Sequence, residues 1–89
     1  MSKEIFAQVL RDARLRAGLT QSQLAKRMAV TQSYVSKYEA AEQRLDIVEI
    51  EAVCVAAGTD LLTLMEKYLE AKSSLPQSAS GVLGPRKDD

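Results

Sequence analysis

Four polar side chains near the middle of the chain have the types and spacing to read the edges of DNA bases. They lie on the outward face of a short helix expected at residues 32–39, and they are Gln32, Ser33, Ser36 and Lys37. Glutamine can donate to and accept from adenine in a bidentate pair, and lysine can reach guanine acceptors or a phosphate. A small, polar face without acids suits a helix that enters the major groove. Each residue alone is an ordinary exposed helix position, so the prediction depends on all four together.

Two capped helix signals position this face. Thr20, with Gln23 three residues later, has capping-box spacing and predicts a helix at about 21–28. Thr31 is a second N-cap and opens the helix at 32–39, about one turn further along the chain. Gln21 falls at the start of the earlier helix, where its side chain and the backbone N–H groups together favour a phosphate oxygen.

Three further helices are expected around this pair, so the predicted fold class is all-α with five helices. The first runs from about Lys3 to Ala17 and is stopped by a left-handed Gly18. Its apolar stripe consists of Phe6, Leu10, Ala13 and Ala17. Asp46 caps a fourth helix at about 47–57, whose inward face consists of Ile47, Ile50, Val53, Cys54 and Ala57.

The fifth helix, which Thr59 or Asp60 caps and which runs to about Ala71, is unusually apolar. Its large apolar side chains are Leu61, Leu62, Leu64, Met65, Tyr68 and Leu69. This band is wider than a surface helix of a monomer needs. Two interpretations stay open: either all of it is core, or part of it is a dimer seam made by Leu61, Leu62, Met65, Tyr68 and Leu69.

Length and composition bound the kind of protein. Eighty-nine residues allow one small domain, expected at 1–72, followed by a Ser-, Pro- and Gly-containing flexible tail at 73–89. No apolar run is long enough to span a membrane and no secretory signal is visible, so a cytoplasmic protein is expected. The sequence lacks histidine, a glycine-rich phosphate loop and a second cysteine beside Cys54. Neither an enzyme, nor a metal site, nor a cofactor is therefore expected.

Charge is divided unevenly along a chain whose formal net charge is zero. Residues 1–44 hold eight Lys or Arg and four acids, a net of +4, whereas residues 45–72 hold two bases and six acids, a net of −4. The basic half contains the capped helix pair. A dipolar protein of this kind could present one face to phosphate, although an ordinary solvated helix has a similar pattern.

The sequence resembles the lambda-repressor-like, Xre-type helix-turn-helix family over roughly residues 6–70. The resemblance is carried by Leu10-Arg11, Arg14, Gly18-Leu19-Thr20-Gln21, Leu24-Ala25, Val30-Thr31-Gln32-Ser33, Val35-Ser36, Tyr38-Glu39 and Leu45-Asp46. It is specific as a combination, because it fixes spacing across three expected helices. It implies a five-helix DNA-binding domain that usually acts as a homodimer on a near-palindromic operator.

The resemblance also implies roles for individual residues. The family's base-contacting positions fall on the four polar residues of the third helix, and its phosphate-contacting glutamine falls on Gln21. Its backbone contacts from the loop after the third helix fall around Glu42, Gln43 and Arg44. Tyr34, which spacing places too far out for the core, is expected to touch the sugar-phosphate backbone or a thymine methyl.

Two further features come with the family pattern. It pairs Arg14 of the first helix with Glu39 at the end of the third, as an ion pair at the edge of the core that sets the recognition helix's angle. It usually has glycine where this chain has Ala29, and glycine and a basic residue where this chain has Ala41 and Gln43. Alanine at position 29 would cost about 1–2 kcal/mol if the left-handed turn is kept.

These observations predict a homodimeric, sequence-specific transcriptional regulator, most simply a repressor, that binds double-stranded DNA with its third helix. Two alternatives stay open. One is an antitoxin that represses its own operon, with residues 73–89 ordering on a partner protein. The other is a protein-interaction adaptor that no longer binds DNA, against which the acid-free face of the third helix argues.

Overall fold

The computed structural model describes residues 3–73, which form five α-helices. In chain order these are α1 (Lys3–Arg16), α2 (Gln21–Met28), α3 (Gln32–Glu39), α4 (Ile47–Ala56) and α5 (Leu61–Ser73). The all-α prediction is confirmed, and the bounds of α2 and α3 agree with those expected from the caps. The predicted tail, apart from Ser73, lies outside the described residues.

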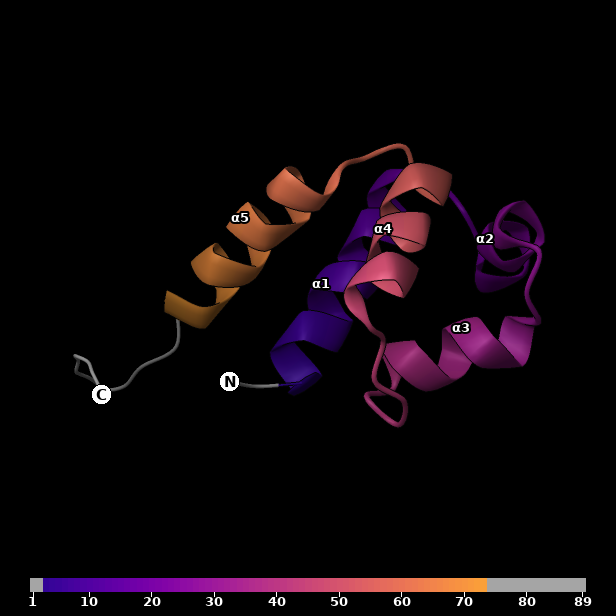
Figure 1. The fold of residues 1–89 in the computed structure, drawn as a ribbon, viewed down its shortest axis with the longest axis horizontal. Coiled ribbons are helices and arrows are strands. Elements are labelled where there is room, and N and C mark those ends of the chain that lie inside the picture. Colours follow the sequence, from indigo (N-terminus) through magenta and orange to yellow (C-terminus); the bar gives the residue numbers. More distant parts are fainter. Residues whose placement is uncertain (1–2, 74–89) are drawn as a thin grey trace.

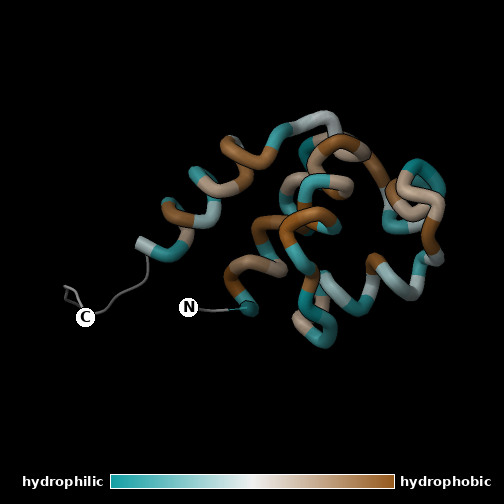
Figure 2. The backbone as a smooth tube through the Cα atoms, in the orientation of Figure 1, coloured by the Kyte–Doolittle hydropathy of each residue, from teal (hydrophilic) through white to brown (hydrophobic). Residues whose placement is uncertain are grey.

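The helix pair lies at one end of the molecule and α5 at the other, with α1 and α4 between them (Figure 1). Helix α1 packs against both α3 and α5, while α2 packs against α3 and α4. Helix α3 is mostly pale or teal in Figure 2, whereas α5 alternates between brown and teal along its length. Helix α3 therefore lies at one end of the molecule and is the more polar of the two helices.

Side-chain caps start the helices where the sequence indicated. The Thr20 hydroxyl accepts from the Gln23 N–H at 3.1 Å, and the Gln23 side chain accepts from the Thr20 N–H at 2.9 Å. Thr31 accepts from the Tyr34 N–H at 3.1 Å. Asp46 and Glu49 form a second reciprocal capping box, with both hydrogen bonds at 2.8 Å. These bonds satisfy backbone donors that have no partner inside the helix.

The core is aliphatic with two tyrosines. Its most deeply buried side chains come from all five helices: Tyr38, Leu10, Leu24, Leu64, Val35, Val53 and Cys54. Because Cys54 is buried among them, it fills space as a small apolar residue. None of the helices within residues 3–73 is long and apolar enough to cross a membrane.

Two expected core positions are wrong. Ala17 is exposed because α1 ends at Arg16, one residue earlier than its stripe suggested. Ile47 is 57% exposed, although it shares a helical stripe with the buried Cys54. The buried part of that stripe is confined to the C-terminal half of α4, and Ile47 is its first residue. Helix α4 also exposes Val48 and Val55, so its apolar pattern could not identify one inward face.

Helix α5 divides its apolar side chains between core and solvent. Leu64 and Tyr68 are buried, whereas Leu62 is 72% and Leu69 is 56% exposed. Tyr68 packs edge-on against Phe6 of α1, with ring centroids 5.4 Å apart. The structure therefore places Tyr68 in the core of its own chain, and the interpretation that the whole band of α5 is core is wrong.

Candidate nucleic-acid interface

The outward face of α3 carries all four of the residues predicted to contact bases. Gln32, Ser33, Ser36 and Lys37 are exposed, and the opposite face buries Val35 and Tyr38 completely. Burial raises the pKa of Tyr38 far above its ordinary value, so this phenol stays neutral. The two buried side chains fix the rotation of α3 about its axis, and this rotation determines which residues face outward.

An ion pair joins the end of α3 to α1. Arg14 Nε donates to Glu39 Oε2 at 2.8 Å, and Arg14 Nη2 donates to Glu39 Oε1 at 3.0 Å. The two side chains are only 9% and 3% exposed. The hydrogen bond to Glu39 raises the pKa of Arg14, against the opposing effect of burial. A third bond, from Arg14 Nη1 to the Leu19 carbonyl at 2.9 Å, ties the same guanidinium to the end of the α1–α2 connection.

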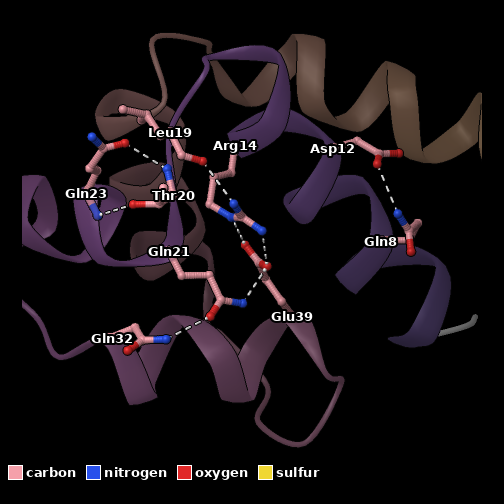
Figure 3. Close-up of polar contacts among 9 residues, drawn as sticks. All are labelled: Gln8, Asp12, Arg14, Leu19, Thr20, Gln21, Gln23, Gln32 and Glu39. Carbon is pink, nitrogen blue, oxygen red and sulfur yellow. Dashed lines mark hydrogen bonds and ion pairs between the residues drawn. The ribbon is translucent and has the colours of Figure 1, made fainter.

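Two glutamines extend this pair to the outward face of α3, as Figure 3 shows. Gln21 Nε2 donates to Glu39 Oε1 at 3.1 Å, and Gln32 Nε2 donates to Gln21 Oε1 at 3.2 Å. An ionised carboxylate only accepts, so the amide nitrogen of Gln21 must face Glu39 and its oxygen must face Gln32. The orientation of the Gln32 amide is therefore set, step by step, from Arg14.

The link leaves Gln32 able to read a base. A primary amide has two N–H donors and one carbonyl acceptor. One N–H of Gln32 is used toward Gln21, so one donor and the oxygen remain. A bidentate pair with adenine needs one donor and one acceptor. The arrangement thus holds the side chain in place and leaves free the groups that a base contact needs. It joins the Arg14–Glu39 pair, which the sequence had predicted, to Gln21 and Gln32, which the sequence had assigned to separate DNA contacts.

Tyr34 does not lie where spacing alone suggested. Its ring is half-buried against the core and meets Tyr38 edge-on, with ring centroids 5.8 Å apart. Its hydroxyl donates to Glu49 Oε2 of α4 at 3.2 Å. Burial and this hydrogen bond raise the pKa of Tyr34. The expectation that Tyr34 is too exposed for the core is wrong, because α4 supplies an acceptor that spacing within α3 could not reveal.

The loop after α3 begins with a left-handed alanine. Ala41 has φ 61°, and the following N–H, of Glu42, donates to the Lys37 carbonyl at 2.9 Å. This is the bond of a Schellman helix end, where glycine is usual. Beyond it Arg44 is exposed and Gln43 is half-buried.

The turn between α2 and α3 has the same geometry. Ala29 has φ 58° and ψ 41°, and the Val30 N–H donates to the Ala25 carbonyl at 3.0 Å. The chain has therefore kept the left-handed turn without the glycine, at a cost of about 1–2 kcal/mol. Of the two possibilities that the sequence allowed, a kept turn and a relaxed one, the first is observed.

One basic residue of the helix pair faces elsewhere. Arg27 Nη1 donates to the Ala56 carbonyl at 3.1 Å, at the C-terminal end of α4. A cation at that position complements the helix dipole and satisfies a free carbonyl. Charge counting along the sequence had grouped Arg27 with the basic half. Within residues 3–73, no group of His, Cys, Asp or Glu side chains is arranged to hold a metal ion.

Comparison with known proteins places this geometry in a family. A family model described as a helix-turn-helix domain matches residues 5–66. An XRE-family-like protein from Pseudomonas syringae pv. tomato str. DC3000 is 41% identical, with a TM-score of 0.70 over 76% of this chain and 83% of that chain. No curated protein gave a match to the sequence.

Two more distant solved structures share the fold. The clp gene regulator ClgR from Corynebacterium glutamicum has a TM-score of 0.74 at 22% identity, covering 80% of this chain and 76% of that one. The tetramer of the restriction-modification controller protein C.Esp1396I, in complex with its natural 35 base-pair operator, has a TM-score of 0.73 at 22% identity, covering 78% and 91%. With the family model and the closer relative from Pseudomonas, the chain belongs to the lambda-repressor-like, Xre-type helix-turn-helix family of DNA-binding transcriptional regulators.

Proposed function

We propose that this protein is a homodimeric repressor that reads a near-palindromic operator with α3 in the major groove. The observation that supports this most directly is the hydrogen-bonded series Arg14–Glu39–Gln21–Gln32. It presents a pre-oriented amide at the exposed N-terminal end of α3. A side chain held in its binding geometry loses less conformational entropy when it meets a base, so the contact is stronger and more selective.

The contacts divide into two kinds. Gln32, Ser33, Ser36 and Lys37 face base edges along α3 and give sequence preference. Gln21, Gln43 and Arg44 face the phosphate backbone, where they set the register of the protein on the duplex. Gln21 keeps one N–H for a phosphate, because its other N–H is used toward Glu39. Tyr34, whose hydroxyl donates to Glu49, helps to hold α3 against α4.

A dimer would place two copies of α3 about 34 Å apart on one face of DNA. The seam is best sought on α5, where Leu62 and Leu69 are exposed and Leu61 and Met65 are half-buried. Tyr68 is buried in its own chain and is left out of this seam. The tetrameric assembly of the operator-bound C.Esp1396I controller, which has the same fold, supports a DNA complex with several copies.

The antitoxin alternative depends on residues 73–89, of which only Ser73 is described, so nothing in residues 3–73 favours it. The adaptor alternative is disfavoured by the outward face of α3. A surface retained only for protein contacts would not need an amide positioned through three other polar side chains.

Selection of bound sites from random double-stranded DNA tests the proposed function. The expected result is one enriched sequence with two related half-sites whose centres are one helical turn, about 10–10.5 base pairs, apart or a multiple of it. Arg44→Ala should lower the yield for all sequences without changing the enriched motif, since a phosphate contact carries no sequence information. Failure to enrich any sequence at low salt would contradict the proposal.

Sedimentation tests the seam separately. Leu69→Glu should convert a dimer to a monomer, because it places a charge in the apolar seam. Val55→Glu is the matched control, since Val55 is 74% exposed on α4. If Val55→Glu abolishes the dimer and Leu69→Glu leaves it intact, the seam lies on α4 and the α5 assignment is wrong.

A further inference from the structure

An apolar pocket of about 500 Å³ opens between α1, α5 and the loop that follows α3. Its size lies within the range of small-molecule sites in proteins. Side chains from four helices line it, principally Phe6, Leu10, Tyr38, Ile50, Met65 and Tyr68. The first and last of these are the edge-on aromatic pair that joins α1 to α5. The pocket is distinct from the outward face of α3, which contributes none of its lining residues.

Two of the residues that line this pocket, Tyr38 and Tyr68, have buried hydroxyls without a hydrogen-bond partner. Tyr38 is 1% and Tyr68 is 8% exposed, and neither phenolic oxygen meets a donor or acceptor within the described part of the chain. Buried hydroxyls are normally partnered, because leaving them unpaired forfeits the hydrogen bonds they made to water. Both rings line the same pocket, so a small movement of each ring would let its hydroxyl bond a molecule held there.

The chemistry of the pocket narrows that molecule. A phenol hydroxyl can donate, and a carboxylate accepts through two oxygens without competing as a donor. The charged residues that line the pocket, Lys3, Glu4 and Arg44, are all exposed. They carry two positive charges and one negative, and the net positive charge attracts an anion. The remaining wall is aliphatic and aromatic, so it suits an apolar body.

We propose that this pocket binds a small carboxylic acid with an apolar body. The body contacts Phe6, Leu10 and Met65, and the carboxylate accepts hydrogen bonds from the hydroxyls of Tyr38 and Tyr68. Small shifts of the two rings, of the kind side chains make on binding, bring the hydroxyls onto the ligand. The long side chains of Lys3 and Arg44 supply positive charge beside the carboxylate.

The pocket also shares residues with the proposed DNA surface. Gln43 and Arg44 line its wall, and both belong to the loop assigned to phosphate contacts. A ligand that engages Arg44 removes a cation from the phosphate, so occupancy and DNA binding oppose each other. This regulatory consequence rests on the proposed function, whereas the binding site itself does not.

Titration with sodium octanoate, followed by amide shifts in nuclear magnetic resonance, tests the site. Octanoate should bind saturably and shift amides of α1, α5 and the loop after α3. Octylammonium, which has the same chain and only donors, should bind at least tenfold more weakly. Equal binding of the two, or octanoate shifts that do not saturate, would overturn the proposal, as would a second copy of the chain filling the pocket at high protein concentration.

Hydroxyl deletions sharpen the test. Tyr38→Phe and Tyr68→Phe each remove an unpartnered group, so both variants should fold with unchanged or higher melting temperature. Each should weaken octanoate binding by roughly tenfold, the value of one hydrogen bond to a charged group. Tyr34→Phe is the matched control, because its hydroxyl lies on Glu49 outside the pocket, and it should leave octanoate affinity unchanged. Unchanged affinity in the Tyr38→Phe/Tyr68→Phe double variant would overturn the assignment.

Measurement of DNA affinity with and without octanoate tests whether occupancy of the pocket opposes DNA binding. Octanoate should weaken the wild-type protein's affinity for its selected DNA site several-fold and should have little effect on the double Phe variant. Saturable octanoate binding with unchanged DNA affinity would overturn the regulatory consequence alone. Absence of any DNA binding would instead overturn the proposed function, and the octanoate titration would still decide the site.

Discussion

Four helices are each followed by a residue in the left-handed conformation, which we call a corner. The four corners share one hydrogen-bonding pattern but not one residue type. Within residues 3–73, positive φ occurs at Gly18 and Gly58, both 74°, and at Ala29 and Ala41, 58° and 61°. After each corner, the next N–H donates to the carbonyl five residues back. The glycine corners end α1 and α4. The alanine corners end α2 and α3, so they lie on both sides of α3, the proposed recognition helix.

The fold accepts backbone strain at the two ends of α3 and avoids it at the ends of α1 and α4. A left-handed alanine costs about 1–2 kcal/mol, so the two ends of α3 carry a cost that the supporting helices avoid. What offsets it is burial of Val35 and Tyr38 together with the Arg14–Glu39 pair. Strain of this kind persists where the surroundings over-determine the conformation, and that is commonly at functional sites. The side-chain contacts of α3 thus stabilise its position, whereas the two left-handed alanines at its ends destabilise it.

Removing the polar support should have the largest effect on this balance. Arg14→Ala leaves the nearly buried carboxylate of Glu39 without its cation, and we expect a loss of about 3–5 kcal/mol in the free energy of unfolding. Urea denaturation measures it. Arg11→Ala, an exposed position on the same helix, is the control and should change stability by about 0.5 kcal/mol or less. Equal effects of the two substitutions would mean that the pair does not hold α3.

Placing glycine at an alanine corner, and alanine at a glycine corner, should change the free energy of unfolding less than Arg14→Ala does. The two exchanges should have opposite signs. Ala29→Gly relieves about 1–2 kcal/mol of strain but adds unfolded-state entropy, for a net stabilisation of about 0.5–1 kcal/mol. Gly58→Ala should destabilise by a similar amount, since an added Cβ there meets no other atom and only the backbone conformation is strained. Urea midpoints compare them. Destabilisation by Ala29→Gly would show that the turn is not strained.

Substitutions at the N-cap residues that follow three of the corners should have the smallest effect on stability. The stability contributed by these caps should depend on pH at only one of them. Thr20, Thr31 and Asp60 cap helices two residues after Gly18, Ala29 and Gly58, and of the three only Asp60 titrates. The Thr63 N–H lowers the pKa of Asp60, so its charged form stabilises the fold above the unfolded pKa. That contribution is lost as pH falls through the lowered folded pKa.

Asp60→Asn keeps a capping acceptor but removes the charge. The melting temperature of the wild type should therefore exceed that of Asp60→Asn slightly at pH 7, and the gap should close in strong acid. Thr31→Ser, which cannot titrate, serves as the control. A gap between Asp60→Asn and wild type that stays constant with pH would contradict the lowered pKa.

Local signals predicted the helices well, because a cap and the helix it starts lie within four residues of each other. Thr20 and Thr31 gave α2 and α3 with their bounds. Contacts between helices were harder. Gln32 bonds Gln21, eleven residues earlier in the chain, and Tyr34 bonds Glu49, fifteen residues later. The spacing of residues within one helix predicts neither partner. The prediction that Ile47 is buried was wrong for a different reason, because α4 has apolar side chains on its exposed face as well as on its buried face.

In the proposed function, α3 reads DNA through the Gln32 amide, whose orientation is set from Arg14 through Glu39 and Gln21. Competition binding of Gln32→Ala, against operators that carry each base at each position, tests it most directly. We predict a loss of about 1–3 kcal/mol of discrimination at one base position per half-site, with affinity for unrelated DNA unchanged. Operator discrimination equal to that of the wild type at every position would contradict base reading by Gln32.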